Sequence, residues 1–121
     1  MKSLKVTLIA ASLALTAGVA QVNAKSEITV KIPKTDMGSD ITTRYECGDF
    51  KLTARYITEG QISIVTLKWP DNYTIASQVV SGSGARYVSG PFIWWENGDE
   101  AKLINTFSDD DDNPAICAAR K

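Results

Sequence analysis

The residues best suited to intermolecular chemistry lie close together at positions 81–87, which read SGSGARY. Ser83, Arg86 and Tyr87 carry hydrogen-bond donors, and the neighbouring glycines permit backbone conformations closed to other residues. A compact polar loop of this kind suits insertion into a cleft of another protein. The alternative is structural: Ser83 caps a turn, and Tyr87 packs in the core.

Enzyme chemistry has little support in the sequence. The chain has no histidine, so it lacks the usual general base of a serine or cysteine nucleophile and the imidazole ligands of many zinc sites. Asp99 and Glu100 could act as a carboxylate pair, but neighbours in a strand point to opposite faces. The two side chains would therefore not converge on one substrate. The Gly-Ser-Gly segment lacks the lysine and helix of a phosphate-binding loop. We therefore expect a binding protein rather than an enzyme, with no cofactor and no metal.

Four consecutive aspartates, Asp109–Asp112, precede an Asn-Pro pair. A calcium loop would need carboxylates at spaced positions and a distal glutamate, and both are missing. We interpret the run as a solvated acidic turn.

The first 24 residues have the features of a secretory signal peptide. Lys2 and Lys5 precede an apolar run over residues 6–19, and Val-Asn-Ala at 22–24 resembles a cleavage site. A membrane anchor is the alternative, but the run is shorter than the roughly 20 residues of a spanning helix. With no cysteine near the cleavage site, we expect no lipid anchor. The prediction is an exported, periplasmic domain over residues 25–121.

Charge narrows the class of partner. Without Lys2 and Lys5, 11 basic and 14 acidic residues remain, a net charge of −3. Nucleic-acid binding depends on clustered positive charge and is not expected. A mildly acidic surface suits a basic partner.

The two cysteines, Cys47 and Cys117, both follow the signal peptide. An even count in an exported protein indicates a disulfide. Two free thiols in a metal or redox site are the alternative, although the chain has neither a C-x-x-C motif nor histidine.

Apolar residues alternate through most of the remaining chain, as they do in half-buried strands. No long helical period is present, and glycine, proline and asparagine fall at the breaks. Many short strands predict a small antiparallel barrel or a sandwich. The expected strands cover residues 27–34, 45–56 with a turn at 48–49, 61–69, 73–80, 85–89, 92–95, 101–107 and 115–118.

Four features together resemble the bacterial inhibitors of c-type lysozymes. They are Tyr45-x-Cys47, Ser83-Gly84-x-x-Tyr87, Trp95-x-x-Gly98-x-x-Ala101 and the late Cys117. The resemblance covers about Tyr45 to Cys117. It implies an eight-stranded antiparallel β-barrel, and the missing lipid-acceptor cysteine resembles the periplasmic branch of the family.

The resemblance also implies a mode of action. In the family, the serine of the S-G-x-x-Y loop enters the lysozyme cleft and hydrogen-bonds at its catalytic carboxylates, which points to Ser83. A second motif, Y-x-x-x-T-K-G, is poorly matched, because Phe92, Glu96 and Asn97 replace its first three defined residues. Arg86 could supply the positive charge of the motif lysine, which Asn97 replaces. Invertebrate-type lysozymes are an alternative target. The expected target-binding residues are Ser83, Gly84, Arg86, Tyr87, Asn97 and Gly98.

Two other functions are compatible with the sequence. One is a periplasmic barrel that binds a small ligand among its aromatic side chains, and the other is a structural domain of the envelope. A large apolar cavity inside the barrel would favour the ligand carrier. A filled interior with a protruding loop at residues 81–87 would favour the inhibitor. The sequence leaves the oligomeric state open.

Overall fold

The computed structural model describes residues 26–108 and 114–121 of the chain. The predicted signal peptide and the run Asp109–Asp112 fall outside the described residues, so both stay predictions. The chain divides into one unit over residues 1–30 and a second over residues 31–121. In the first unit, the described residues 26–30 form no helix or strand. Among the described residues, no helix is long and apolar enough to cross a membrane.

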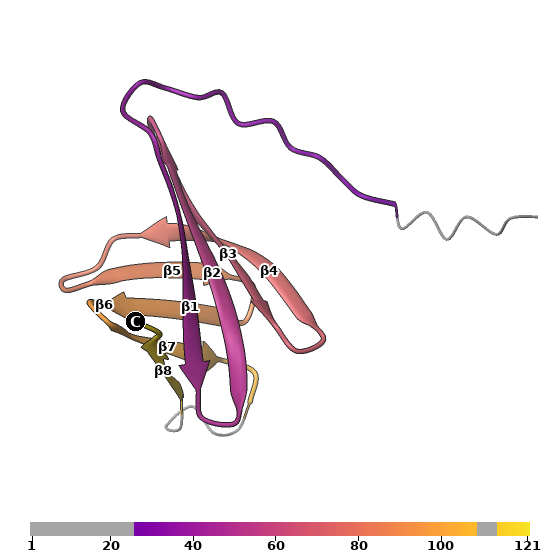
Figure 1. The fold of residues 1–121 in the computed structure, drawn as a ribbon, viewed down its shortest axis with the longest axis vertical. Helices are drawn as coiled ribbons and strands as arrows, with labels where there is room; N and C mark the ends of the chain where they lie inside the picture. The colour runs from indigo at the N-terminus through magenta and orange to yellow at the C-terminus, as the bar shows by residue number, and fades with distance from the viewer. Residues whose placement is uncertain (1–25, 109–113) are drawn as a thin grey trace, which may run out of the picture. The chain divides into compact units, whose positions relative to one another are not determined.

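The second unit is a closed antiparallel β-barrel in which each strand pairs with its neighbour in sequence and β1 pairs with β8 (Figure 1). This confirms the all-β prediction, decides for the barrel over the sandwich, and agrees with the eight strands that the resemblance implies. The strands are β1 (Ser39–Cys47), β2 (Phe50–Glu59), β3 (Ile62–Trp69), β4 (Asn72–Val79), β5 (Ala85–Ser89), β6 (Phe92–Asn97), β7 (Glu100–Asn105) and β8 (Ala115–Ala119).

The strand expected over residues 27–34 is wrong. Residues 26–35 form no strand, and Ile28 and Val30 are 95% and 75% exposed. Alternating apolar residues stabilise a strand only where a neighbouring strand pairs with it and a core covers one face. The first strand is instead β1, which starts at Ser39, earlier than the alternation at Tyr45 indicated, because its first half is largely exposed and polar.

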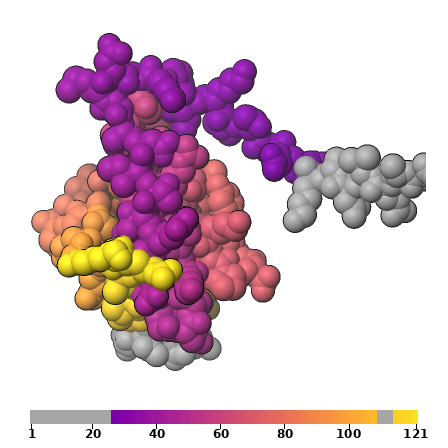
Figure 2. Space-filling view, viewed as in Figure 1, coloured from indigo at the N-terminus to yellow at the C-terminus, as the bar shows by residue number. Residues whose placement is uncertain are grey.

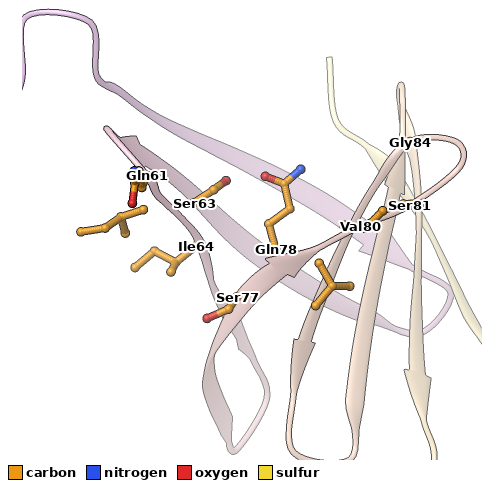
Figure 3. Close-up of a pocket in the computed structure, with 10 residues that line it drawn as sticks. Gln61, Ser63, Ile64, Ser77, Gln78, Val80, Ser81 and Gly84 are labelled. Carbon is orange, nitrogen blue, oxygen red and sulfur yellow. The ribbon is translucent and has the colours of Figure 1, made fainter.

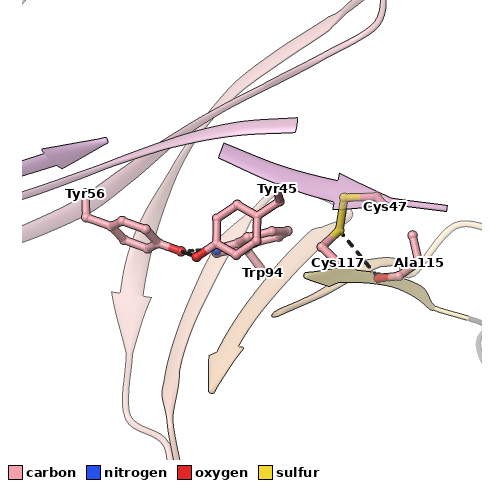
Figure 4. Close-up of a disulfide and its surroundings, with 6 residues drawn as sticks. All are labelled: Tyr45, Cys47, Tyr56, Trp94, Ala115 and Cys117. Atoms are coloured by element: carbon pink, nitrogen blue, oxygen red, sulfur yellow. Dashed lines mark hydrogen bonds between the residues drawn. A yellow bond between two sulfur atoms is a disulfide. The ribbon is translucent and has the colours of Figure 1, made fainter. Parts of the chain in front are cut away.

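Buried apolar and aromatic side chains from every strand form one core cluster, in which Trp94 is the largest fully buried side chain. The Tyr45 ring packs edge-on against Trp94, with the ring centroids 5.1 Å apart. The Trp94 indole donates a hydrogen bond to the Tyr56 hydroxyl (2.9 Å), which also bonds the Tyr45 hydroxyl (2.7 Å) (Figure 4). Within the described residues, every buried side-chain nitrogen or oxygen has a partner. This core of packed aromatic side chains favours the inhibitor over the ligand carrier, whose aromatic side chains would line a cavity.

The seam between β1 and β8 closes the barrel. Only Tyr45 and Glu46 pair with β8 in the strand register, and the C-terminal residues lie beside β1 (Figure 2). The predicted disulfide joins Cys47 to Cys117 across this seam, with the Cα atoms 4.1 Å apart. A crosslink that encloses 70 residues stabilises the fold by about 4 kcal/mol in the chain-entropy account. The disulfide therefore reinforces the barrel where strand pairing is shortest.

Candidate target-binding site at the loop between β4 and β5

The segment 81–87 divides into two parts in the structure. Residues 80–84 form the loop between β4 and β5, whereas Ala85, Arg86 and Tyr87 are already in β5. Ala85 pairs with Glu96, the penultimate residue of β6. The loop therefore lies at the same end of the barrel as the tight turn between β6 and β7.

Two side chains fix the backbone of the loop at Ser83. The Ser81 hydroxyl donates to the carbonyl oxygen of Ser83 over 2.6 Å, and the Trp95 indole N–H donates to the same oxygen over 2.9 Å. One carbonyl oxygen has two lone pairs and can accept both bonds. Ser83 itself is exposed. Its carbonyl oxygen is therefore held by Ser81 and Trp95, while its side chain faces solvent.

Gly84 lets the loop approach β6 closely. Its φ is +61°, in the left-handed region that disfavours other residues. A Cβ at this position would collide with the carbonyl oxygen of Glu96 and lie 3.3 Å from the Trp95 indole nitrogen. Glycine is therefore required both by the backbone conformation and by the space available.

The other predicted site residues occupy different surroundings. Tyr87 faces the interior, is 6% exposed and lies against Tyr56, with the ring centroids 5.8 Å apart. Burial raises the pKa of the Tyr87 phenol. Asn97 and Gly98 are exposed at the turn between β6 and β7. Tyr87 is thus placed to support β5 from inside, whereas Asn97 and Gly98 lie at the surface near the loop.

Two small surface depressions flank the loop and share Trp95 as a wall. Ser83 and Asn97 line the same depression, whereas Arg86 lines the other one. Ser83 and Asn97 therefore share a depression, whereas Arg86, which pairs with Trp95 in the strand register, lies on the other side of that tryptophan. The first, of about 260 Å³, is lined by Ser83, Trp95, Asn97, Glu100, Ala101 and Lys102. The second, of about 250 Å³, is lined by Val80, Ser81, Gly82, Arg86, Trp95 and Ile104.

A larger depression of about 650 Å³ lies where β3 and β4 separate (Figure 3). Strand pairing between them ends at Ile64 and Ser77. Beyond this point the depression is lined by polar side chains such as Gln61 and Gln78, and the loop residues Ser81 and Gly84 lie at its edge. The loop thus has accessible surface on both of its sides.

Glu96 lies on the interior face of β6, two residues after Trp94. Partial burial raises the pKa of its carboxyl group. Its charge in turn raises the pKa of the Tyr45 and Tyr87 phenols, after the larger effect of their own burial. The partly buried Glu96 carboxylate therefore lies close enough to Tyr45 and Tyr87 to affect the pKa of both.

Sequence reasoning did not include Trp95 or Lys102 among the site residues. Strand alternation could have placed Trp95 outward, because the buried Trp94 precedes it. Its bond to the loop and its pairing with Lys102 on β7 depend on register, which a single sequence does not fix. Over the described ranges, no group of three or more His, Cys, Asp or Glu residues is placed to hold a metal ion.

The chain is similar to a known protein family over most of the barrel. Residues 45–112 match the family described as membrane-bound lysozyme inhibitor of c-type lysozyme, MliC. The chain belongs to this family. The matched residues include the loop 80–84, Trp95 and the turn between β6 and β7, so the family assignment covers the site as well as most of the barrel.

Two curated relatives carry the family name. A protein of Pseudomonas aeruginosa is 41% identical over 61 residues, which are 49% of this chain and 48% of the relative. One from Cupriavidus necator is 31% identical over 80 residues, which are 64% of each chain. Both are named membrane-bound lysozyme inhibitor of C-type lysozyme. The matched region thus spans from about half to just under two thirds of these relatives.

A solved structure shares the fold. It is the crystal structure of Pseudomonas aeruginosa MliC in complex with hen egg white lysozyme, with a TM-score of 0.66 and 26% sequence identity. The likeness covers 78% of this chain and 97% of that one. The family resemblance drawn from the sequence motifs is confirmed by these comparisons.

Proposed function

We propose that this protein inhibits lysozyme by inserting the loop 80–84 into the active-site cleft of the enzyme. The observation that carries the proposal is the exposed Ser83 on a loop fixed by Trp95 and Gly84, in a chain of the inhibitor family. A fixed loop loses little conformational entropy on binding, and such preorganisation favours affinity. The protein would act on an enzyme without being one.

The chemistry of the target suits the loop. Glycoside hydrolases of the lysozyme kind use a pair of carboxyl groups on either side of the scissile bond. A serine hydroxyl can donate to a carboxylate, and such charge-assisted bonds are stronger than neutral ones. Once the loop occupied the cleft, it would also exclude the substrate. A c-type lysozyme is the expected target, and an invertebrate-type enzyme is the alternative.

The direct test is a lysis assay with the purified protein against c-type, g-type and invertebrate-type lysozymes. Ser83→Ala should weaken inhibition of the sensitive enzyme by about tenfold, as expected for losing a bond to a charged group. Ser39→Ala is the matched control, because Ser39 is an exposed serine at the start of β1. The proposal fails if wild type inhibits none of the enzymes, and loop insertion fails if the two variants behave alike.

Inhibition would be useful to the cell only in its envelope, and we propose that the protein is exported to the periplasm. Support comes from the signal-peptide pattern at residues 1–24 and from relatives named membrane-bound. The intact mass of protein from the periplasm should begin near Lys25, without lipid and two hydrogens below the reduced form. An added lipid mass would instead favour membrane attachment.

A further inference from the structure

We propose that the depression beside the loop, lined by Ser83, Asn97, Glu100 and Lys102, binds a carboxylate of the target, and that Lys102 is its cationic residue. This deepens the proposed function and rests on it for the identity of the target. The sequence motifs had suggested Arg86 for the positive charge. Arg86 lines the depression on the other side of Trp95 instead, whereas Lys102 lines the one that contains Ser83.

The strand register explains why Lys102 lies there. Lys102 on β7 pairs directly with Trp95 on β6, and side chains at paired positions share one face of the sheet. Trp95 in turn donates to the Ser83 carbonyl oxygen. Lys102 and Trp95 are therefore neighbours in one row across the sheet, which Arg86 on β5 continues on the other side of Trp95. Asn97 lies two residues further along β6 on the same face, so Lys102 and Asn97 are both on the side of Trp95 that Ser83 lines.

Three of the polar side chains around this depression can donate to an anion. Ser83, Asn97 and Lys102 bring a hydroxyl, an amide and an ammonium group, all of which donate hydrogen bonds. Ion pairs among the described residues join Arg55 to Asp40, Arg120 to Glu46 and Lys121 to Asp99, and Lys102 belongs to none of them. Its charge is therefore available to a carboxylate that approaches Ser83.

Glu100 is the one acidic residue of this depression. It lies two residues before Lys102 on the same face of β7. A carboxylate held by Lys102 would be repelled by Glu100, and a cation would be attracted by it. Removing each charge separately therefore reports the sign of the group that the depression binds.

The experiment measures inhibition of a c-type lysozyme by Lys102→Gln and Glu100→Gln at low and high salt. Lys102→Gln should weaken inhibition about tenfold at low salt, and Glu100→Gln should strengthen it about two- to fivefold. Both effects should shrink as salt rises. The control is Lys68→Gln, since Lys68 is an exposed lysine that precedes the turn between β3 and β4, at the opposite end of β4 from the loop.

Three results would overturn the assignment while wild type still inhibits. Lys102→Gln could match the Lys68→Gln control, Lys102→Gln could strengthen inhibition while Glu100→Gln weakens it, or both variants could weaken inhibition equally. If wild type inhibits no lysozyme, the proposed function fails, and acetate then tests the depression alone. Acetate should shift the NMR signals of the Asn97 side-chain amide in wild type but not in Lys102→Gln, and equal shifts in both would refute the site.

Discussion

Two adjacent tryptophans on β6 lie in different surroundings. Trp94 is fully buried and donates its indole N–H to the Tyr56 hydroxyl inside the barrel. Trp95 is 37% exposed and donates its indole N–H to the Ser83 carbonyl oxygen in the loop. The same side chain with the same donor thus serves the fold at one position and the candidate site at the next. Because successive side chains of a strand point to opposite faces, one tryptophan lies in the core and the next lies at the candidate binding surface.

Replacing the inner tryptophan should produce the largest effect. Trp94→Ala removes the largest fully buried side chain of the core. Tyr45 then loses its ring contact, and Tyr56 loses the indole donor. The free energy of unfolding should fall by about 3–5 kcal/mol, as for other buried aromatic residues. Urea denaturation measures it. Inhibition per folded molecule should stay close to wild type, and a comparable loss of inhibition would mean that the two faces are not independent.

Adding one methyl group to the loop should affect binding more than stability. Gly84→Ala places a Cβ against the Glu96 carbonyl oxygen at a φ of +61°, which costs about 1–2 kcal/mol unless the loop moves. We expect the loop to shift and inhibition to weaken about tenfold, which corresponds to about 1.4 kcal/mol. Gly82→Ala is the matched control, because a Cβ there meets nothing within 4 Å. Equal inhibition by the two variants would show that the position of the loop does not matter.

Much of the fold was predictable, because side-chain alternation and turn residues are local signals. The pattern from Gln61 to Trp69 matched β3, and the even cysteine count indicated the Cys47–Cys117 disulfide. The expectation for residues 27–34 failed because pairing with a neighbouring strand is not local. An alternating segment and a paired strand look alike in a single sequence.

The candidate site was predictable only in part. Ser83 and Gly84 could be proposed from the sequence because the motif is contiguous, and Asn97 because it falls in the second motif; as binding residues all three stay predictions. Lys102, which we propose as a further residue of this site, has no such signal in the sequence, because its closeness to Ser83 depends on the register between β6 and β7 and on the Trp95 bond to the loop. Tyr87 belongs to the same motif as Ser83, yet the strand resumes at Ala85 and turns its ring into the interior.

Removing only the outer hydrogen bond should give a smaller effect than moving the loop. Trp95→Phe keeps an aromatic ring but loses the donor to Ser83, and one neutral hydrogen bond contributes about 1 kcal/mol. Inhibition should weaken roughly fivefold, with little change in melting temperature. Trp69→Phe is the control, since Trp69 packs edge-on against Phe92 away from the loop. If both variants weaken inhibition alike, the Trp95 bond to the loop carries no special role.

The smallest expected effect concerns Glu96, which shares the interior face of β6 with Trp94. Burial raises the pKa of its carboxyl group above the ordinary value of 4.5, so the folded state binds a proton more readily than the unfolded state. The free energy of unfolding should therefore fall as pH rises from 4.5 through the folded pKa, and this loss should persist at neutral pH. Glu96→Gln removes the ionisation. Because the carboxylate is partly solvated, the gain at pH 7 should be no more than about 0.5 kcal/mol. Urea denaturation of both proteins at pH 4 and pH 7 measures it. Glu100→Gln, on the exposed face of β7, is the control, and a difference between wild type and Glu96→Gln that is the same at both pH values would contradict the account.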